Sequence, residues 1–249
     1  GATTNAPSWT GGASQVACTS CHGSPPGGSH PARAACSDCH SGYTATTVNT
    51  ALHVNGAVDT TLSCTSCHGT SGVNAAPPLS VAGGTATTLV AVGAHQGHVT
   101  AGALRGAIAC TECHPSVTVN NHSDSLVQVA FGPLANNGTT TVWNRTAATC
   151  ASDYCHGGSP ALKGGQQTTP VWTTVSGTQK TCVSCHGNPP PVPHVQNDAC
   201  GSCHSGYSKT GATTGTVNLA VHMNGVIDYG TLTCSSCHGT AGRFGADPN

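Results

Sequence analysis

Charged and aromatic residues are scarce in this chain of 249 residues. Only 6% of the residues are charged and 4% are aromatic, and the formal net charge is −1 at pH 7. The seven Lys and Arg are spread over the whole length, so no basic patch exists to neutralise phosphates, which argues against nucleic-acid binding. Intrinsic disorder explains the composition poorly, because disordered chains usually combine low hydrophobicity with high net charge.

Large apolar side chains are scarce as well. Leu, Ile, Val and Phe together account for 36 residues, a fraction at which burial usually cannot offset chain entropy. The uncharged stretch 60–104 is interrupted by Gly, Pro, Thr, Asn and His, so it lacks the roughly 20 apolar residues of a membrane span. The first residues show no charged start followed by an apolar run, so we expect any secretion signal to have been removed.

Cysteine, in contrast, is abundant and regularly spaced. Seven pairs have the form C-x-x-C with a His directly after the second Cys, and an eighth pair has four residues between its cysteines. The eight motifs are Cys18, Cys21 and His22; Cys36, Cys39 and His40; Cys64, Cys67 and His68; Cys110, Cys113 and His114; Cys150, Cys155 and His156; Cys182, Cys185 and His186; Cys200, Cys203 and His204; and Cys234, Cys237 and His238. Together they use all sixteen cysteines.

This spacing is typical of covalent haem attachment. Two thiols add to the vinyl groups of a haem, and the imidazole that follows becomes the proximal ligand of the iron. Structural zinc also binds paired C-x-x-C, but it needs two pairs per metal and no His after each second Cys. A disulfide scaffold likewise requires no such histidines. We therefore predict eight covalently bound haems c, each with one iron.

Seven further histidines are candidates for the distal iron ligands. They are His30, His53, His95, His98, His122, His194 and His222. A lone His is often a solvated side chain, but seven of them beside eight irons favour bis-histidine ligation, which gives a saturated iron that exchanges electrons with little rearrangement.

An internal repeat organises the chain. The segment 7–70 recurs as 170–240, with P-S-W-T against P-V-W-T, C-H-S-G-Y in both, and H-V-N-G against H-M-N-G. We predict a three-haem copy at 1–70, a two-haem middle segment at 71–169 and a second three-haem copy at 170–249, joined as one continuous haem-packed unit.

The spare histidines are one too few, and the shortage falls in the C-terminal copy, because its three haems have only two spare histidines. Met223 is a candidate for the eighth ligand, but it aligns with Val54, beside the His in each copy, which argues against it. Water, the amino terminus of Gly1 or a group from a neighbouring molecule are the alternatives.

The fold class that we expect is mostly coil with short helical turns and few short strands, wrapped around a chain of eight haems with little conventional hydrophobic core. Gly and Pro number 33 and 15 and interrupt any long helix. The β-rich pieces 87–92 and 117–119 are expected to pair locally. A motif is expected often to begin as a single helical turn, and Trp9 and Trp172 are expected to pack on porphyrins.

The motifs C-x-x-x-x-C-H-G-G at 150–158, C-H-G-N-P-P at 185–190, G-A-H-Q-G-H at 93–98 and the two H-x-N-G turns resemble those of the Geobacter-type C-x-x-x-x-C-H/C-x-x-C-H multihaem cytochromes. The resemblance implies secretion and extracellular or cell-surface electron transfer to acceptors or partner cytochromes, with a periplasmic location as the alternative. Some similar cytochromes polymerise into filaments.

We expect a filament of copies of this chain, because depletion of charge suits a permanent interface better than transient encounters. The second copy also stops after three haems, where the first continues into two more. A monomeric soluble carrier is the first alternative. A multihaem reductase with one open iron is the second, although no C-x-x-C-K motif marks an active haem. We expect no enzyme activity.

Overall fold

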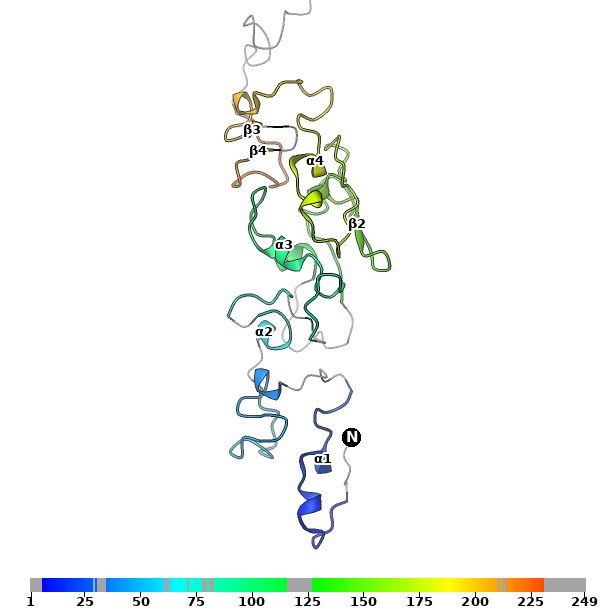
Figure 1. Ribbon diagram of the computed structural model, residues 1–249, viewed down its shortest axis with the longest axis vertical. Coiled ribbons are helices and arrows are strands. Elements are labelled where there is room, and N and C mark those ends of the chain that lie inside the picture. The colour runs from blue at the N-terminus through cyan, green and yellow to red at the C-terminus, as the bar shows by residue number, and fades with distance from the viewer. Residues whose placement is uncertain are drawn as a thin grey trace, which may run out of the picture. The chain divides into compact units, whose positions relative to one another are not determined.

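The computed structural model describes residues 6–28, 30, 35–60, 63–70, 72–77, 80, 83–115, 127–209, 211 and 214–230. Most of these residues lie in turns, bends and coil, as Figure 1 shows. The expected fold class of coil with short helical turns and few strands is confirmed.

Four α-helices of a single turn or little more are present in the described ranges: α1 (Cys18–Cys21), α2 (Cys64–Cys67), α3 (His95–Val99) and α4 (Cys182–Cys185). Six 3₁₀ turns accompany them: Gly12–Gln15, Cys36–Asp38, Cys110–Glu112, Tyr154–His156, Gly177–Gln179 and Cys200–Ser202. Seven of these ten elements begin at or contain a cysteine of a motif. The expectation that a motif starts as a helical turn is thus confirmed for six of the seven motifs that the structure describes. The motif at Cys150 begins in a strand and has its helical turn at the second cysteine.

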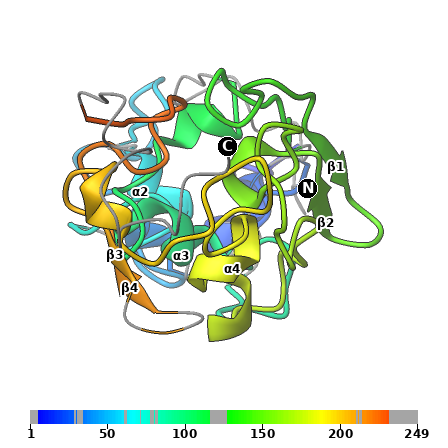
Figure 2. The ribbon, with the colours of Figure 1, turned by 90° about the horizontal axis from the view of Figure 1, so that it is seen from above.

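Two small antiparallel sheets complete the regular structure of the described residues. Strand β1 (Val142–Asn144) pairs with β2 (Thr149–Ala151), with Trp143 opposite Cys150, and Figure 2 shows the two strands side by side. Strand β3 (Ser208–Lys209) pairs with β4 (Gly215–Thr216). The first sheet therefore places a haem-motif cysteine within its ladder.

The prediction of a strand at 87–92 is wrong. These residues form successive turns, in which the amide of Leu89 donates to the carbonyl of Ala86 and the amide of Val92 donates to the carbonyl of Leu89. The Thr, Leu and Val of this piece favour a strand, but a strand also needs a neighbour to accept its backbone hydrogen bonds. The other piece, 117–119, lies outside the described residues.

The described residues bury very little apolar surface. The buried apolar residues among them are Ala76, Val92, Ala135 and Ala148. Three of these four are alanines, which contribute little burial energy. The expected lack of a conventional hydrophobic core is confirmed, so most of the apolar packing must come from a group other than the side chains. No helix in the described ranges has the length and hydropathy needed to cross a membrane.

The chain divides into two compact units. One comprises Gly1–Val92 and Val117–Val127, and the other comprises Gly93–Ser116 and Gln128–Asn249. The second unit begins within the predicted middle segment. The three-part division at 1–70, 71–169 and 170–249 follows the sequence repeat and stays a prediction.

Candidate functional site

One group of motifs is built on α-helical turns. In α1, α2 and α4 both cysteines lie in the helix, and the following His is extended, with φ between −152 and −148°. The serine before the second cysteine supports α2 and α4 through a capping box, in which Ser66 pairs with Ser63 and Ser184 pairs with Thr181. The chain therefore turns away directly after the second cysteine, which directs the His away from the helix axis.

A second group is built on 3₁₀ turns. In the motifs that begin at Cys36, Cys110 and Cys200, the amide of the motif His donates to the carbonyl of the first Cys at 2.8–2.9 Å. The Cys110 motif is tied to a later segment by Glu112, whose Oε2 accepts from the amides of Leu134 and Ala135 at 3.1 and 3.2 Å. Two loops with different backbone paths thus serve the same C-x-x-C-H sequence.

The second cysteines of these 3₁₀ turns have further contacts. The amides of Cys39, Cys113 and Cys203 donate to the carbonyl of the first Cys of their own motif at 3.1–3.2 Å. The thiol of Cys39 also donates to the carbonyl of Ser66 at 3.6 Å, and the carbonyl of Cys203 accepts from the amide of Gly230 at 2.8 Å. A thioether has no S–H to donate, so haem attachment would replace the contact of Cys39 with Ser66. The assignment of Cys39 and Cys203 to haem stays a prediction.

The motif with four intervening residues has its own architecture. Cys150 lies in β2, and Cys155 lies in the 3₁₀ turn Tyr154–His156. The carboxylate of Asp153 caps this turn by accepting from the amide of His156 at 2.9 Å. Gly157 follows with a φ of 76°. A Cβ at Gly157 would lie 1.7 Å from the carbonyl oxygen of Cys185, so a glycine is required where this motif packs against the next one.

Six motif histidines face one spare histidine each. The pairs are His22 with His53, His40 with His30, His114 with His95, His156 with His98, His186 with His222, and His204 with His194. Their ring centroids are 6.2–6.4 Å apart in every case, whereas the interplanar angles range from 6 to 78°. The separation is therefore constant although the relative orientation of the rings is not.

This constant separation fits one metal ion between two imidazoles. A metal–nitrogen bond of about 2.0–2.1 Å on each side, with each nitrogen about 1.1 Å from its ring centre, spans about 6.2–6.4 Å. Direct packing of two rings would not hold the distance constant while the angle varies. In the described part of the chain, no three His, Cys, Asp or Glu side chains converge as a metal site of side chains alone requires. Each imidazole pair therefore fits an ion whose remaining ligands come from a bound group such as a porphyrin.

Nδ1 of most of the described histidines contacts a backbone carbonyl. Nδ1 lies 2.5–2.9 Å from a carbonyl oxygen in eight histidines: His22, His40, His68, His98, His114, His186, His194 and His204. His222 makes the same contact with the carbonyl of Leu104. A proton on Nδ1 that is donated to a carbonyl leaves the lone pair on Nε2 for a metal and fixes the ring orientation. These contacts therefore favour ligand-competent imidazoles.

His156 differs from the other described motif histidines, because its Nδ1 is buried and has no hydrogen-bond partner in the described part of the chain. Burial lowers the pKa of His156 to about 4, and burial also lowers the pKa of its partner His98. Burial raises the pKa of Asp153 to about 6. Both imidazoles are therefore neutral at pH 7, which is the protonation state that binds metal.

Four half-buried cysteines are poorly suited to act as reactive thiols. None of the thirteen whose side chains the structure describes forms a disulfide. Burial raises the pKa of Cys150 and of Cys155 to about 12, and the pKa of Cys113 and of Cys185 to about 11. Since redox-active and zinc-binding cysteines act as thiolates, this environment suits neutral sulfur, as in a thioether to haem.

Three aromatic residues contact these histidines, although the sequence did not predict which imidazoles they contact. Tyr43 lies 5.9 Å from His40 and 6.2 Å from His53, both edge to face. Tyr207, its counterpart in the second copy, lies 5.8 Å from both His204 and His222. The C-H-S-G-Y repeat was the available signal, but nothing in its spacing indicates which imidazoles the ring contacts.

Trp172 is the third such residue, at 4.7 Å from His95 and 5.5 Å from His98. The ring of Trp172 also meets Trp143 at 6.3 Å. That Trp172 packs on a porphyrin stays a prediction. Trp9, its counterpart in the first copy, is fully exposed.

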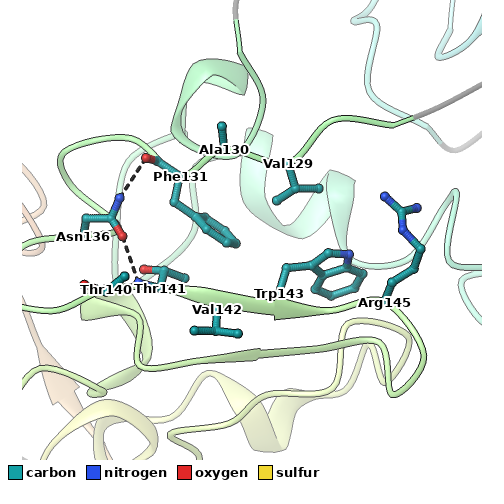
Figure 3. A pocket seen from close by; sticks show the side chains of 9 residues that line it. All are labelled: Val129, Ala130, Phe131, Asn136, Thr140, Thr141, Val142, Trp143 and Arg145. Atoms are coloured by element: carbon teal, nitrogen blue, oxygen red, sulfur yellow. Dashed lines mark hydrogen bonds between the residues drawn. The ribbon is translucent and has the colours of Figure 1, made fainter. Parts of the chain in front are cut away.

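A cavity of about 460 Å³ lies beside β1 (Figure 3). Phe131 and Trp143 give it apolar walls, and Arg145 lies at one end. The side chain of Asn136 holds the wall together by donating to the carbonyl of Phe131 at 2.8 Å and accepting from the amide of Thr141 at 2.9 Å. Apolar rings with one guanidinium suit part of a flat apolar group that carries carboxylates at its edge.

Two polar groups of the C-terminal copy that could serve an open catalytic iron have other contacts. Lys209 forms an ion pair with Asp198 at 2.6 Å, and Asp228 accepts from the side chain of Asn224 at 2.9 Å. Met223 has a φ of 65° and Val54 a φ of 67°, so the two occupy equivalent turns, as the alignment predicted.

The eighth motif lies outside the described residues. Its thioether cysteines Cys234 and Cys237 and its proximal ligand His238 all fall in the range 231–249, as does Arg243. The spare histidine His122 falls in the range 116–126, which the structure does not describe either. The haem assignments of Cys234, Cys237, His238 and His122 therefore stay predictions from the sequence.

Comparisons with known proteins agree with this site. A model of the Geobacter CxxxxCH...CXXCH motif matches residues 149–186, and a model of cytochrome c3 matches residues 174–243. No curated protein and no solved structure matches the chain. The chain is thus a multihaem c-type cytochrome, that is, an electron-transfer protein with covalently attached haem.

Proposed function

We propose that this chain binds eight haems c and conducts electrons along them outside the cytoplasm as the subunit of a homopolymeric filament. The observation that carries the proposal is the constant separation of 6.2–6.4 Å in six imidazole pairs. When bound, the haems supply one-electron exchange without a bond-breaking step. The polypeptide attaches them, supplies two imidazoles to most irons and orients those imidazoles.

The proposed assignment extends to all eight motifs. The six pairs account for six motif histidines and six spare histidines. We assign His122 to the iron at His68, because it is the seventh spare histidine. The iron at His238 then takes its distal ligand from outside this set of histidines, which agrees with the shortage expected in the C-terminal copy. This iron is where a reductase activity, the second alternative, would have to reside.

The proposal of a filament is based on the charge and the exposed apolar residues of the protein surface. The sequence contains seven basic and eight acidic residues in all, too few for the charged rims that usually guide transient encounters between soluble carriers. The unit that begins the chain exposes Trp9, Val16, Val54 and Val58 almost completely. Exposed apolar groups with little charge favour a permanent contact with another protein surface, and we propose that the surface is another copy of this chain.

Two measurements test the proposal. Intact mass of the secreted protein gives the haem number, with an expected excess of eight haems over the polypeptide and a loss of one haem in the double variant with Cys234→Ser and Cys237→Ser. A smaller excess in the parent protein would contradict the count. Cryo-electron microscopy of the same preparation should show filaments with a fixed repeat, whereas discrete particles at all concentrations would leave the monomeric carrier as the function.

A further inference from the structure

The three aromatic side chains at the site share one arrangement. Under the proposed ligand assignment, each ring contacts imidazoles that belong to two different pairs. Tyr43 contacts His53, from the pair with His22, and His40, from the pair with His30. Each contact is between rings at centroid distances typical of aromatic packing. Tyr43 therefore lies at the junction of the first two sites along the chain.

The second copy repeats this junction. Tyr207 contacts His222, from the pair with His186, and His204, from the pair with His194. The interplanar angles are 63–64° at Tyr43 and 67–68° at Tyr207, and all four distances lie within 5.8–6.2 Å. Two separate segments of the chain thus reproduce the same three-ring arrangement.

The middle segment reaches a similar arrangement with a different residue. His95 and His98 lie three positions apart on α3, which places them on one face of the helix. Trp172 lies far from both histidines in the sequence but contacts both rings. It meets His95 edge to face at an interplanar angle of 88° and His98 at an interplanar angle of 30°. The pairs concerned are His95 with His114 and His98 with His156.

Local contacts fix the position of Trp172. Its amide donates to the carbonyl of Ala148 at 2.7 Å, and its ring meets Trp143 edge to face at 6.3 Å. A Cβ on Gly93 would lie 1.9 Å from Nε1 of Trp172. The glycine just before α3 therefore leaves the space that the indole occupies.

The loop that carries Trp172 does not itself require a half-buried indole. In this loop the amide of Val171 donates to the side-chain oxygen of Gln179 at 2.7 Å. The first copy has the equivalent hydrogen bond, in which the amide of Ser8 donates to the side-chain oxygen of Gln15 at 2.5 Å, yet Trp9 is fully exposed. The contact of Trp172 with the two imidazoles is therefore additional to the folding of the loop.

We propose that Tyr43, Trp172 and Tyr207 are positioning residues, each of which holds imidazole ligands of two successive haem sites in a fixed relative orientation. The inference rests on the proposed ligand assignment. Nδ1 of His40, His98, His204 and His222 is already held by a carbonyl, so the aromatic ring adds a second restraint on the rotation of an imidazole about its metal–nitrogen axis. One side chain thereby couples the ligand orientations of two neighbouring irons.

The test compares Tyr207→Leu with Tyr207→Phe in the secreted, haem-loaded protein. Low-spin ferric signals in electron paramagnetic resonance respond to the orientation of axial imidazoles, and intact mass gives the haem number. We expect Tyr207→Leu to shift the signals of two haems, those at His204 and His222, with the haem number unchanged. Tyr207→Phe keeps the ring and should restore both signals. A parental spectrum for Tyr207→Leu, or a failure of Tyr207→Phe to restore it, would overturn the proposal.

Trp172→Leu and Trp9→Leu form a second, matched comparison, because the two residues occupy equivalent loops. Trp172→Leu should shift the signals of the His95 and His98 sites, and Trp9→Leu should leave the signals of these two sites unchanged. An equal shift of these signals in both variants would contradict the proposal. If Tyr207→Leu does not accumulate, Tyr43→Leu tests the equivalent contact in the first copy. An unshifted spectrum of the Tyr43→Leu variant would contradict the proposal.

Single replacements His222→Ala and His98→Ala identify the signals, since each should remove the low-spin signal of its own site. If they do not, the ligand assignment fails whatever the tyrosine and tryptophan variants show. If they do and Tyr207→Leu has no effect, the assignment stands and the positioning role fails.

Discussion

At the scale of single residues, the two ring nitrogens of a histidine have separate roles. Nδ1 contacts a backbone carbonyl, and Nε2 is left for a metal. His222 shows this well, since Nδ1 contacts the carbonyl of Leu104 and the ring faces His186 at 6.4 Å. Burial lowers the pKa of His222, so the neutral imidazole is favoured at pH 7. The neighbour Met223 lines a small cavity together with Arg105 and Leu134, and His222 lines the same cavity. The ring that faces His186 and the carbonyl contact of Nδ1 therefore favour His222 as the ligand.

The first prediction separates these two residues. Replacement of His222 by Ala should open one iron, because the paired imidazole is lost while the thioethers and His186 remain. In the reduced protein, the number of haems that bind carbon monoxide should be one higher than in the parent. Met223→Leu is the matched control and should leave the number unchanged. An increase in the Met223 variant would restore methionine as a ligand.

A second prediction concerns Glu112. Its Oε2 accepts from the amides of Leu134 and Ala135, so Glu112→Ala leaves two donors without their acceptor. Hydrogen bonds to charged groups are worth about 1.5–3 kcal/mol each, and we expect the free energy of unfolding to fall by about 2 kcal/mol or more. Denaturant unfolding of the haem-loaded protein measures it. Glu112→Gln keeps an oxygen at the same place and should lose less than half as much, whereas equal losses would contradict this role for the carboxylate.

At the scale of elements, single helical turns replace the longer helices and strands of an ordinary fold. The sequence was sufficient to predict these turns, because C-x-x-C-H fixes which side chains must face one haem. It was not sufficient to predict the pairing of histidines, since the partners lie 10 residues apart in His30 and His40 but 31 apart in His22 and His53. Which histidines pair depends on how the coil between the motifs folds back. Coil has no sequence periodicity from which such contacts could be predicted.

The strands illustrate the same limit. The ladder between β1 and β2 brings Trp143 opposite Cys150, whereas the β-rich piece 87–92 forms turns. Strand formation depends on a neighbouring segment and on packing more than on intrinsic preference. The aromatic contacts of Tyr43, Trp172 and Tyr207 were likewise outside the reach of sequence reasoning, because each joins segments whose proximity is a tertiary property.

A third prediction belongs to the junction between two motifs. Gly157→Ala introduces a Cβ that would lie 1.7 Å from the carbonyl oxygen of Cys185, at a φ of 76° that disfavours alanine. We expect haem attachment at the Cys150 motif, the Cys182 motif or both to fail, which intact mass and peptide mapping would show as a loss of one or two haems. Gly177→Ala is the control, because a Cβ there meets nothing within 4 Å. Full haem loading of the Gly157 variant would refute the close packing.

At the scale of the whole molecule, the scarcity of buried side chains means that the cofactors supply most of the apolar packing. Among the described residues, the buried apolar side chains of Ala76, Val92, Ala135 and Ala148 cannot offset the entropy of ordering that part of the chain. Folding and haem attachment are therefore coupled, as metal binding and folding are in small metalloproteins. The depletion of charge at this scale leads to a prediction on assembly.

The fourth prediction is that filament assembly depends weakly on salt. Interfaces built on opposite charges weaken as ionic strength rises, because screening shortens the range of attraction to about 8 Å at 0.15 M and about 3 Å at 1 M. This chain has fifteen charged residues, counting seven basic and eight acidic ones. Filament length distributions by electron microscopy should therefore be similar at low salt and at about 1 M sodium chloride. Dissolution of the filaments at the higher salt concentration would indicate an ionic interface instead.

The identical pairing in the two copies has a consequence for how such a chain can lengthen. His22 with His53 and His40 with His30 correspond to His186 with His222 and His204 with His194, and both pairs of each copy close within that copy. Duplication of the segment therefore adds two self-sufficient centres at once. Under the proposed assignment, the third centre of the first copy takes its distal histidine from the middle segment, and the third centre of the second copy has no spare histidine. Every duplication therefore also adds one centre that the histidines of the copy do not complete.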